Sequence, residues 1–229
     1  SLQTSLGQAF IVENKPGAGT NIANRALIDS PPDGYTLMVN GTGALAINPG
    51  LYPKLPYDPI RDFAPVTRLV TVTQTLVVNP SFAAKTVKAM VAIAKARPGE
   101  LNYGTVGPGS SAHLAMAMLE HAVDIKLEQI PYSGFPQILT AIIGGDIDAA
   151  FMVPGIAMPQ VEAGKVKALA IGSAQRSPLA PDLPTLREAG FEGFDGTTWF
   201  ALMGPAGLDP KVVSELNRHV NTVLRDPDL

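Results

Sequence analysis

The stretch NYGTVGPGSSAHLAM, Asn102–Met116, contains a short strand pattern, a glycine-rich loop and the start of a helical pattern. Two serines, Ser110 and Ser111, stand directly before the helical part, and the stretch contains no Asp, Glu, Lys or Arg. A strand followed by a loop and a helix is the repeating unit of α/β folds with parallel sheets. The stretch therefore predicts an α/β protein.

The same unit recurs along the chain, because short apolar runs alternate with amphipathic helical patterns. Strands buried on both faces of a parallel sheet are nearly continuous apolar runs, and these runs have that character. We predict an α/β fold with two mostly parallel sheets. The predicted strands are 10–14, 35–40, 75–79, 101–104, 125–132, 148–153 and 166–172. The predicted helices are 21–29, 86–97, 111–121, 136–143, 155–163 and one that begins at Asp209-Pro210.

Two further segments, 73–82 and 197–207, have the pattern of extended chain. Helical patterns do not flank them in the regular alternation that surrounds the other predicted strands. They are interpreted as crossover strands between two domains. The first predicted lobe comprises residues 1–78 and 198–229, and the second comprises residues 79–197.

The composition excludes several classes of function. The chain has 229 residues and no cysteine, so disulfides, zinc thiolate sites and thiol nucleophiles are excluded. The net charge is −3 without a lysine or arginine cluster, which argues against nucleic acid and acidic membranes as partners. We expect no transmembrane helix, because no run of 18 apolar residues occurs. We also expect no cofactor and no metal site.

The two ends of the sequence resemble interrupted elements. It opens on SLQTSLGQAF, which resembles the end of a helix, and it closes on NTVLRDPDL, inside or just after another helix. No signal peptide pattern is present. We expect the sequence to be an excerpt of a longer protein.

The loop within the opening stretch has the properties of an anion site. Loops at the carboxyl ends of parallel strands face the ligand crevice, and the following helix presents free N–H groups. Such a helix end holds an anion without any basic side chain. The glycines would let the backbone approach a ligand, and Ser110 and Ser111 could donate hydroxyl hydrogen bonds. The alternative is structural: the glycines form a turn and Ser110 caps the helix.

A second loop, NGTGALAIN at 40–48, is also uncharged and rich in glycine, with the Thr42 hydroxyl available as a donor. Its Asn-Gly pair could instead mark a hairpin. The residues that follow lack strand alternation, which favours a loop that enters a helix. We expect these two loops, one from each lobe, to face each other across a cleft. Two such loops on opposite sides of a cleft favour a role in ligand binding over a purely structural role.

Catalytic motifs are absent from the sequence. It has no GxSxG, GxxxxGK[ST] or HExxH. Ser110 and Ser111 lie near His113, which leaves a hydrolase with a serine nucleophile and a histidine base as an alternative. Our prediction is that the chain is not an enzyme and has no catalytic residue.

Six motifs occur in order along essentially the whole chain, and together they resemble one family. They are VENKPGAGTNIA, PPDGYTLM, INPGLYPKLPYDPIRDFAPVT, LNYGTVGPGSSAHL, AGKVKALAIGSAQRSPLAPDLPTLREAG and GPAGLDP. The chain resembles the tripartite tricarboxylate transporter receptors, the Bug-type periplasmic solute-binding proteins.

The resemblance implies a two-lobe periplasmic-binding-protein architecture whose crossover strands serve as a hinge. It implies a monomeric periplasmic receptor that binds a small carboxylate and delivers it to the membrane subunits of a tripartite transporter. Some members are thought to act as sensors, so a ligand-sensing module that binds a partner protein is a further alternative. The implied ligand-binding residues are Thr42, Gly43, Thr105, Gly107, Ser110, Ser111, His113, Tyr132, Ser133, Gly134, Phe151 and Met152.

The sequence departs from the family pattern at two of these positions and at its beginning. Met152 replaces a frequent aspartate, and Ser133 replaces a frequent lysine. Loss of the aspartate removes a partner for a ligand amino group, so the resemblance implies a carboxylate without one. Members usually begin with a strand and a loop that forms much of the carboxylate site, and the present sequence starts after both.

Overall fold

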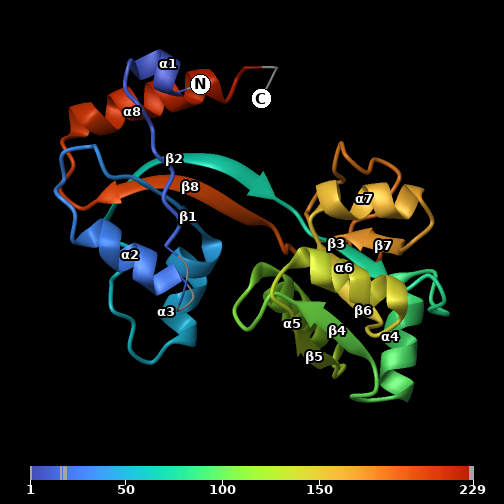
Figure 1. Cartoon of the computed structure of the whole chain (residues 1–229). Coiled ribbons are helices and arrows are strands. Elements are labelled where there is room, and N and C mark those ends of the chain that lie inside the picture. The colour runs from blue at the N-terminus through green and yellow to red at the C-terminus, as the bar shows by residue number, and fades with distance from the viewer. Residues whose placement is uncertain (1, 16, 18–19, 227–229) are drawn as a thin grey trace. The chain divides into compact units, whose positions relative to one another are not determined.

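The computed structural model describes residues 2–15, 17 and 20–226, and the chain divides into two compact units (Figure 1). Unit 1 comprises residues 1–71 and 199–229, and unit 2 comprises residues 72–198. Both units combine helices with a sheet, which agrees with the predicted α/β class. Residues 72–78, assigned above to the first lobe, lie in unit 2 because their strand pairs with two strands of that unit.

The sheet of unit 2 has five strands in the order β5-β4-β6-β3-β7. β4 runs parallel to β5 and to β6, whereas β3 runs antiparallel to both of its neighbours, β6 and β7. The sheet is therefore mixed, and the expectation of mostly parallel pairing is wrong for β3. The strands are β3 (Thr75–Val78), β4 (Asn102–Thr105), β5 (Glu128–Pro131), β6 (Ala149–Met152) and β7 (Lys167–Ile171).

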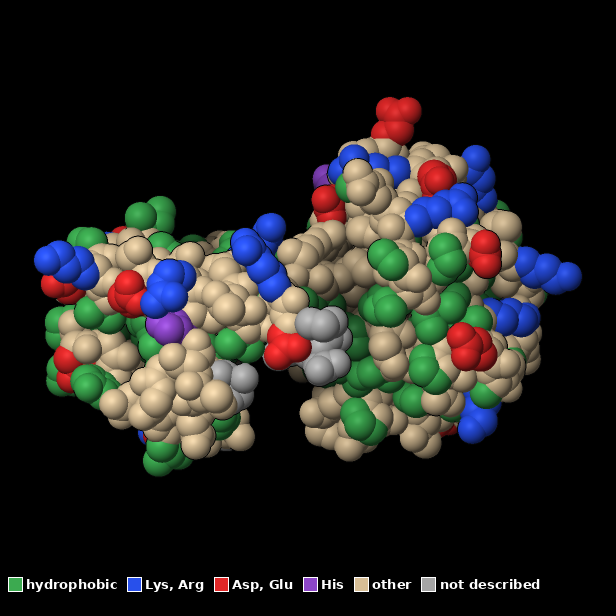
Figure 2. All heavy atoms as spheres, turned by 90° about the horizontal axis from the view of Figure 1, so that it is seen from above, with side chains coloured by type: hydrophobic (Ala, Val, Ile, Leu, Met, Phe, Trp, Pro, Cys, Tyr) green, Lys and Arg blue, Asp and Glu red, His purple; other side chains and the backbone are tan. Residues whose placement is uncertain are grey.

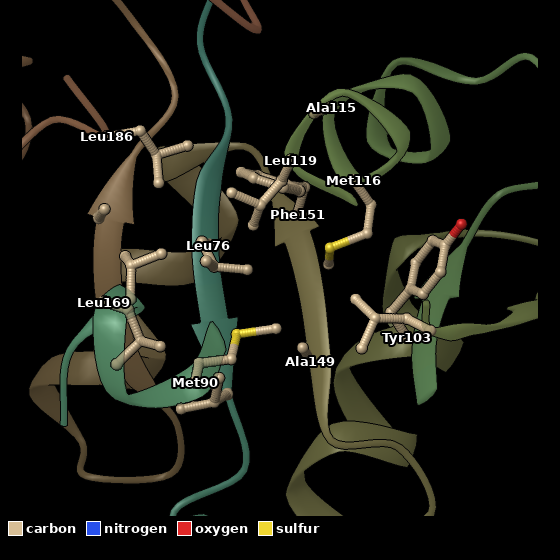
Figure 3. Packing of buried hydrophobic residues seen from close by; sticks show 14 of the residues in the cluster. Leu76, Met90, Tyr103, Ala115, Met116, Leu119, Ala149, Phe151, Leu169 and Leu186 are labelled. Atoms are coloured by element: carbon tan, nitrogen blue, oxygen red, sulfur yellow. The ribbon is translucent and has the colours of Figure 1, made fainter. Parts of the chain in front are cut away.

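Helices cover both faces of this sheet. They are α4 (Val87–Ala96), α5 (Ser111–Val123), α6 (Phe135–Gly144) and α7 (Pro154–Glu162). Successive residues of a strand point to opposite faces, so each strand supplies side chains to two cores. Leu76 and Phe151 pack with Met90 of α4 and Met116 of α5, as Figure 3 shows. Their strand neighbours belong to the second core, with side chains of α6 and α7.

Unit 1 has a three-stranded sheet in the order β1-β8-β2, in which β1 is antiparallel to β8. One core lies on the α2 side of the sheet, and a second core packs the sheet against α8. The sequence analysis did not predict β2. The elements are α1 (Leu2–Leu6), α2 (Asn21–Ile28), β1 (Met38–Gly41), a π-helical turn (Gly43–Ile47), α3 (Asn48–Leu51), β2 (Phe63–Val72), β8 (Thr198–Pro205) and α8 (Pro210–Val223).

The strand predicted at 10–14 is wrong. These residues are irregular, and Ile11 and Val12 are 92% and 87% exposed. A strand needs a hydrogen-bonded neighbour, and none of the described residues pairs with this segment. A groove of about 690 Å³ lies beside it, lined by this segment, the amino end of β1 and parts of α2 and α8.

Charge is dispersed over the face of the molecule that Figure 2 shows. On the face shown in Figure 2, lysine and arginine side chains are interspersed with aspartate and glutamate side chains. Among the residues that the structure describes, no helix has both the length and the apolar character needed to span a membrane.

Candidate functional site

Three loops of unit 2 meet at one edge of its sheet. They follow β4, β5 and β6 and lead into α5, α6 and α7. Because these three strands are parallel, their carboxyl ends lie at the same edge, and the three helices begin there. β3 runs in the opposite direction, so its first residue, Thr75, pairs with the last residues of β6 and β7, Met152 and Ile171. We call this region the ligand edge.

The β4–α5 loop is shaped by its glycines. Gly107 and Gly109 have φ values of 110° and 77°, in the region that favours glycine. The Thr105 hydroxyl accepts hydrogen bonds from the Gly107 backbone N–H at 3.1 Å and from the Gln129 amide at 2.8 Å. Thr105 is fully buried, so its side chain holds the loop in place and is not available to a ligand.

Ser110 and Ser111 play different structural roles at the start of α5. Ser110 is the N-cap, and its hydroxyl accepts a hydrogen bond from the His113 backbone N–H at 3.3 Å. This contact confirms the capping alternative for Ser110. The Ser111 hydroxyl instead accepts a hydrogen bond from the Gln74 amide at 3.3 Å. The first N–H groups of a helix have no intrahelical partner, so α5 presents N–H donors and a partial positive charge beside Ser111.

His113 lies in the first turn of α5 and is half-buried. Its ring Nδ1 accepts a hydrogen bond from the Gly109 backbone N–H at 3.1 Å. Nδ1 is thereby an acceptor, so the ring proton of neutral His113 resides on Nε2, where it is available as a donor. None of the described hydrogen bonds joins this ring to the hydroxyl of Ser110 or Ser111. The geometry therefore lacks the nucleophile–base contact of a serine hydrolase.

The loop after β5 contributes Tyr132, Ser133 and Gly134. The Tyr132 backbone N–H donates to the Thr105 carbonyl at 2.8 Å, which ties this loop to the end of β4. Ser133 is exposed, and Gly134 is the N-cap of α6. A second helix N-terminus thus lies at the same edge.

Phe151 and Met152 do not offer their side chains to a ligand. Both are 0% exposed. Phe151 stacks on Phe194 with ring centroids 6.3 Å apart, and Met152 belongs to the core under α6 and α7. Consecutive residues of β6 point to opposite faces of the sheet, and both faces are covered by helices. Neither side chain is accessible in this structure, and the assignment of the two residues to ligand binding stays a prediction.

Thr42 and Gly43 lie in unit 1, directly after β1. The Thr42 hydroxyl accepts a hydrogen bond from the Trp199 backbone N–H at 2.9 Å and donates to the Trp199 carbonyl at 3.3 Å. Thr42 thus fastens the loop to β8. Gly43 begins the π-helical turn that leads into α3, which confirms that this loop enters a helix.

A buried polar network supports the same loop, and the sequence analysis missed it. The Asn40 amide donates to the Asn24 side-chain carbonyl at 2.7 Å, and the Gly41 N–H donates to the Asn40 side-chain carbonyl at 2.9 Å. The Tyr57 hydroxyl donates to the Ala44 carbonyl at 2.6 Å. The asparagines near the end of the strand and in the preceding helix, Asn40 and Asn24, are the signal that could have indicated this network.

The carboxyl groups with lowered pKa values, those of Asp58, Asp62, Glu188 and Glu215, do not belong to the loops after β4, β5 and β6. Backbone N–H donors of Arg61 and Ile60 lower the pKa of Asp58. The Thr185 N–H and the Arg176 side chain lower the pKa of Glu188. These carboxylates stabilise local turns. The loops of the ligand edge contain no Asp, Glu, Lys or Arg from Thr105 to His113 or from Tyr132 to Gln137.

Comparison with known protein families places the whole chain in one of them. Residues 1–229 match the family described as tripartite tricarboxylate transporter family receptor. A curated relative is the protein BugT of Bordetella pertussis. It is 37% identical over 226 residues, which cover 98% of this chain and 69% of BugT.

Two solved structures are similar to this chain over nearly its full length. One is an R. palustris protein solved with adipate, 31% identical, with a TM-score of 0.89. The other is MatC from Rhodopseudomonas palustris with bound malate, 32% identical, with a TM-score of 0.88. Each match covers 99% of this chain, and it covers 76% of the first neighbour and 77% of the second.

Proposed function

This chain belongs to the tripartite tricarboxylate transporter receptor family, and we propose that it binds a small dicarboxylate without an amino group. As a member of that family it is a solute-binding receptor, not a hydrolase. We propose that it acts as a monomer in the periplasm and delivers its ligand to the membrane subunits of a tripartite transporter.

The observation that carries the proposed ligand is the uncharged ligand edge of unit 2. Helices α5 and α6 both begin there, and a helix N-terminus stabilises an anion through its free N–H groups and its dipole. The Ser111 hydroxyl and the His113 Nε2–H stand beside the start of α5 as further donors. These donors suit a carboxylate group.

The same edge disfavours an ammonium group. A ligand amino group needs acceptors, preferably a carboxylate, and the loops described above supply no carboxylate. The position where the family often has aspartate is Met152, whose side chain is fully buried. The neighbours solved with adipate and with malate support dicarboxylates as the class to test.

Calorimetric titration of the full-length protein with malate, adipate, aspartate and glutamate tests the proposal. We expect malate or adipate to bind at least tenfold more tightly than the two amino acids. Tighter binding of aspartate or glutamate would overturn the ligand class. Absence of binding to all four would overturn the proposed dicarboxylate function.

The Ser111→Ala variant tests the place of the site. A hydrogen bond to a charged group contributes about 1.5–3 kcal/mol, so we expect roughly 10- to 100-fold weaker binding. Ser214→Ala, on the polar side of α8 in unit 1, is the control. Unchanged affinity of Ser111→Ala would show that the carboxylate does not bind at the start of α5.

A further inference from the structure

Gln74 is a buried polar residue at the ligand edge that the proposed site does not yet use. It precedes β3 directly and is 1% exposed. Leu76, two residues later, points into the core toward Phe151 and the helix α5 (Figure 3). Because residues two apart share a face of the sheet, Gln74 lies on this side as well, under the first turn of α5.

The backbone carbonyl of Gln74 is held by a short hydrogen bond from the residue that follows β7. Its carbonyl accepts a hydrogen bond from the Gly172 N–H at 2.7 Å, and the Gly172 carbonyl accepts one from the Gly196 N–H at 2.7 Å. A methyl group at Gly172 would lie 3.2 Å from the Gln74 carbonyl oxygen, so this approach is close. Gln74 therefore occupies a fixed position relative to β7.

The side-chain amide of Gln74 is only half paired. Its Nε2 donates to the Ser111 hydroxyl oxygen at 3.3 Å, while its Oε1 is buried without a hydrogen-bond partner among the described residues. A buried unpaired amide oxygen destabilises the fold, and an apolar side chain of the same length would avoid that cost. The stability of the fold alone therefore does not explain a glutamine at position 74.

The contact with Gln74 determines what Ser111 can offer to a ligand. A hydroxyl group has one proton to donate and two lone pairs to accept with. Since the Gln74 amide occupies a lone pair, the Ser111 proton remains to be donated, and none of the hydrogen bonds described for this part of the chain uses it. The start of α5 then presents N–H and O–H donors, and this set is complementary to a carboxylate.

We propose that Gln74 is a positioning residue that directs the Ser111 hydroxyl proton to a ligand carboxylate at the start of α5. This inference rests on the proposed function, because it assumes that a carboxylate binds there. It adds a source of specificity to that function. The Gln74 amide fixes the Ser111 hydroxyl as a hydrogen-bond donor, which favours ligands that present hydrogen-bond acceptors.

Gln74→Met tests the proposal with a side chain of matched length that lacks the amide. Without ligand, we expect a higher melting temperature, because the unpaired oxygen is gone. The affinity for the tighter-binding dicarboxylate, malate or adipate, should fall about three- to tenfold, since the Ser111 hydroxyl is no longer held in one orientation. Gln160→Met, the same substitution near the end of α7, is the control and should retain the affinity.

Gln74→Glu gives a second, independent test. A carboxylate at this position accepts but does not donate, so it would take the Ser111 proton and repel the ligand. We expect a greater loss of affinity than in Gln74→Met, and the loss should diminish as the pH falls and the glutamate becomes protonated. A loss that does not depend on pH would contradict the proposed role.

The double variant Gln74→Met/Ser111→Ala separates a positioning role from a general structural one. If Gln74 acts through Ser111, the double variant should bind as weakly as Ser111→Ala alone. Losses that multiply, or a Gln74→Met variant that binds as tightly as the unchanged protein, would overturn this inference while the proposed function stands. If the unchanged protein binds neither malate nor adipate, the proposed function fails, and this inference fails with it.

Discussion

The Thr42 hydroxyl makes two hydrogen bonds to the backbone of Trp199, accepting from its N–H at 2.9 Å and donating to its carbonyl at 3.3 Å. One side chain thereby satisfies a donor and an acceptor of β8, 157 residues further along the chain. The sequence analysis interprets Thr42 as a ligand donor. The structure gives its hydroxyl a role within unit 1, where it fixes the loop after β1.

Thr42→Val should therefore destabilise unit 1. Valine has nearly the same shape but leaves the N–H and the carbonyl of Trp199 unpaired, at a cost of about 1–3 kcal/mol. Thr42→Ser keeps the hydroxyl and is the control. Urea denaturation, followed by the fluorescence of the single tryptophan, measures the difference. Equal stability of the two variants would contradict the structural role.

Ser110→Ala should reduce stability more than it reduces affinity. Loss of an N-cap hydroxyl costs about 1 kcal/mol. Thr86→Ala, at the N-cap of α4, removes a comparable contact, in which the hydroxyl accepts from the Ala89 N–H at 3.2 Å. We expect similar decreases in the free energy of unfolding, measured by circular dichroism in urea. A Ser110→Ala variant with unchanged stability would mean that the cap does not form.

Gly104→Ala should destabilise unit 2 by about 1–3 kcal/mol through overpacking. A Cβ atom at Gly104 would lie 2.6 Å from Cδ1 of Ile147 and 3.0 Å from Cγ2 of Ile138. Gly155→Ala is the control, because no atom lies within 4 Å of its added Cβ and alanine favours the helix. Thermal unfolding measures both variants, and an equally stable Gly104→Ala variant would refute the close packing of β4 against α6.

Stability should fall at alkaline pH because of Tyr103. Burial, with a smaller contribution from Glu120, raises the pKa of Tyr103 to about 12. An exposed tyrosine has a pKa of about 10, so between these values the unfolded chain has lost this proton while the folded chain keeps it. The contribution of Tyr103 is thus fully present below about pH 10 and is lost as the pH rises toward 12.

Tyr103→Phe should flatten this decline, since phenylalanine has no proton to lose. Tyr35→Phe, which changes a side chain that is 83% exposed, should leave the slope unchanged. The free energy of unfolding of both variants, measured in urea at several pH values from about 9 to 11.5, makes the comparison. An equally steep decline in Tyr103→Phe would assign the alkaline sensitivity to another group.

The sequence predicted most of unit 2 because local signals agree there with the final contacts. The apolar period of the helix predicted at 111–121 and the serine before it specify both the body and the cap of α5. The runs predicted at 75–79, 101–104 and 148–153 contain β3, β4 and β6, whose residues are almost all buried, as in strands between two helical layers. These features depend on residues that are neighbours in sequence, so a single sequence can reveal them.

Local sequence patterns were misleading where the existence or the direction of a strand depends on pairing with a strand that is distant in the sequence. The segment 10–14 has strand propensity, but no described strand pairs with it, so it remains irregular and exposed. The antiparallel direction of β3 follows from its pairing with β6 and β7, which no local pattern encodes.

The sequence by itself determined the α/β class, the family and the uncharged loops of the ligand edge, because composition, period and motif order are local properties of the chain. Only the tertiary structure decided which side chains can act there. It buried Phe151 and Met152 in the cores, turned Thr105 and Ser110 to structural hydrogen bonds, and placed Gln74 beside Ser111 across 37 residues of chain. The direction of a side chain, toward a core or toward a ligand, depends on contacts between residues far apart in sequence.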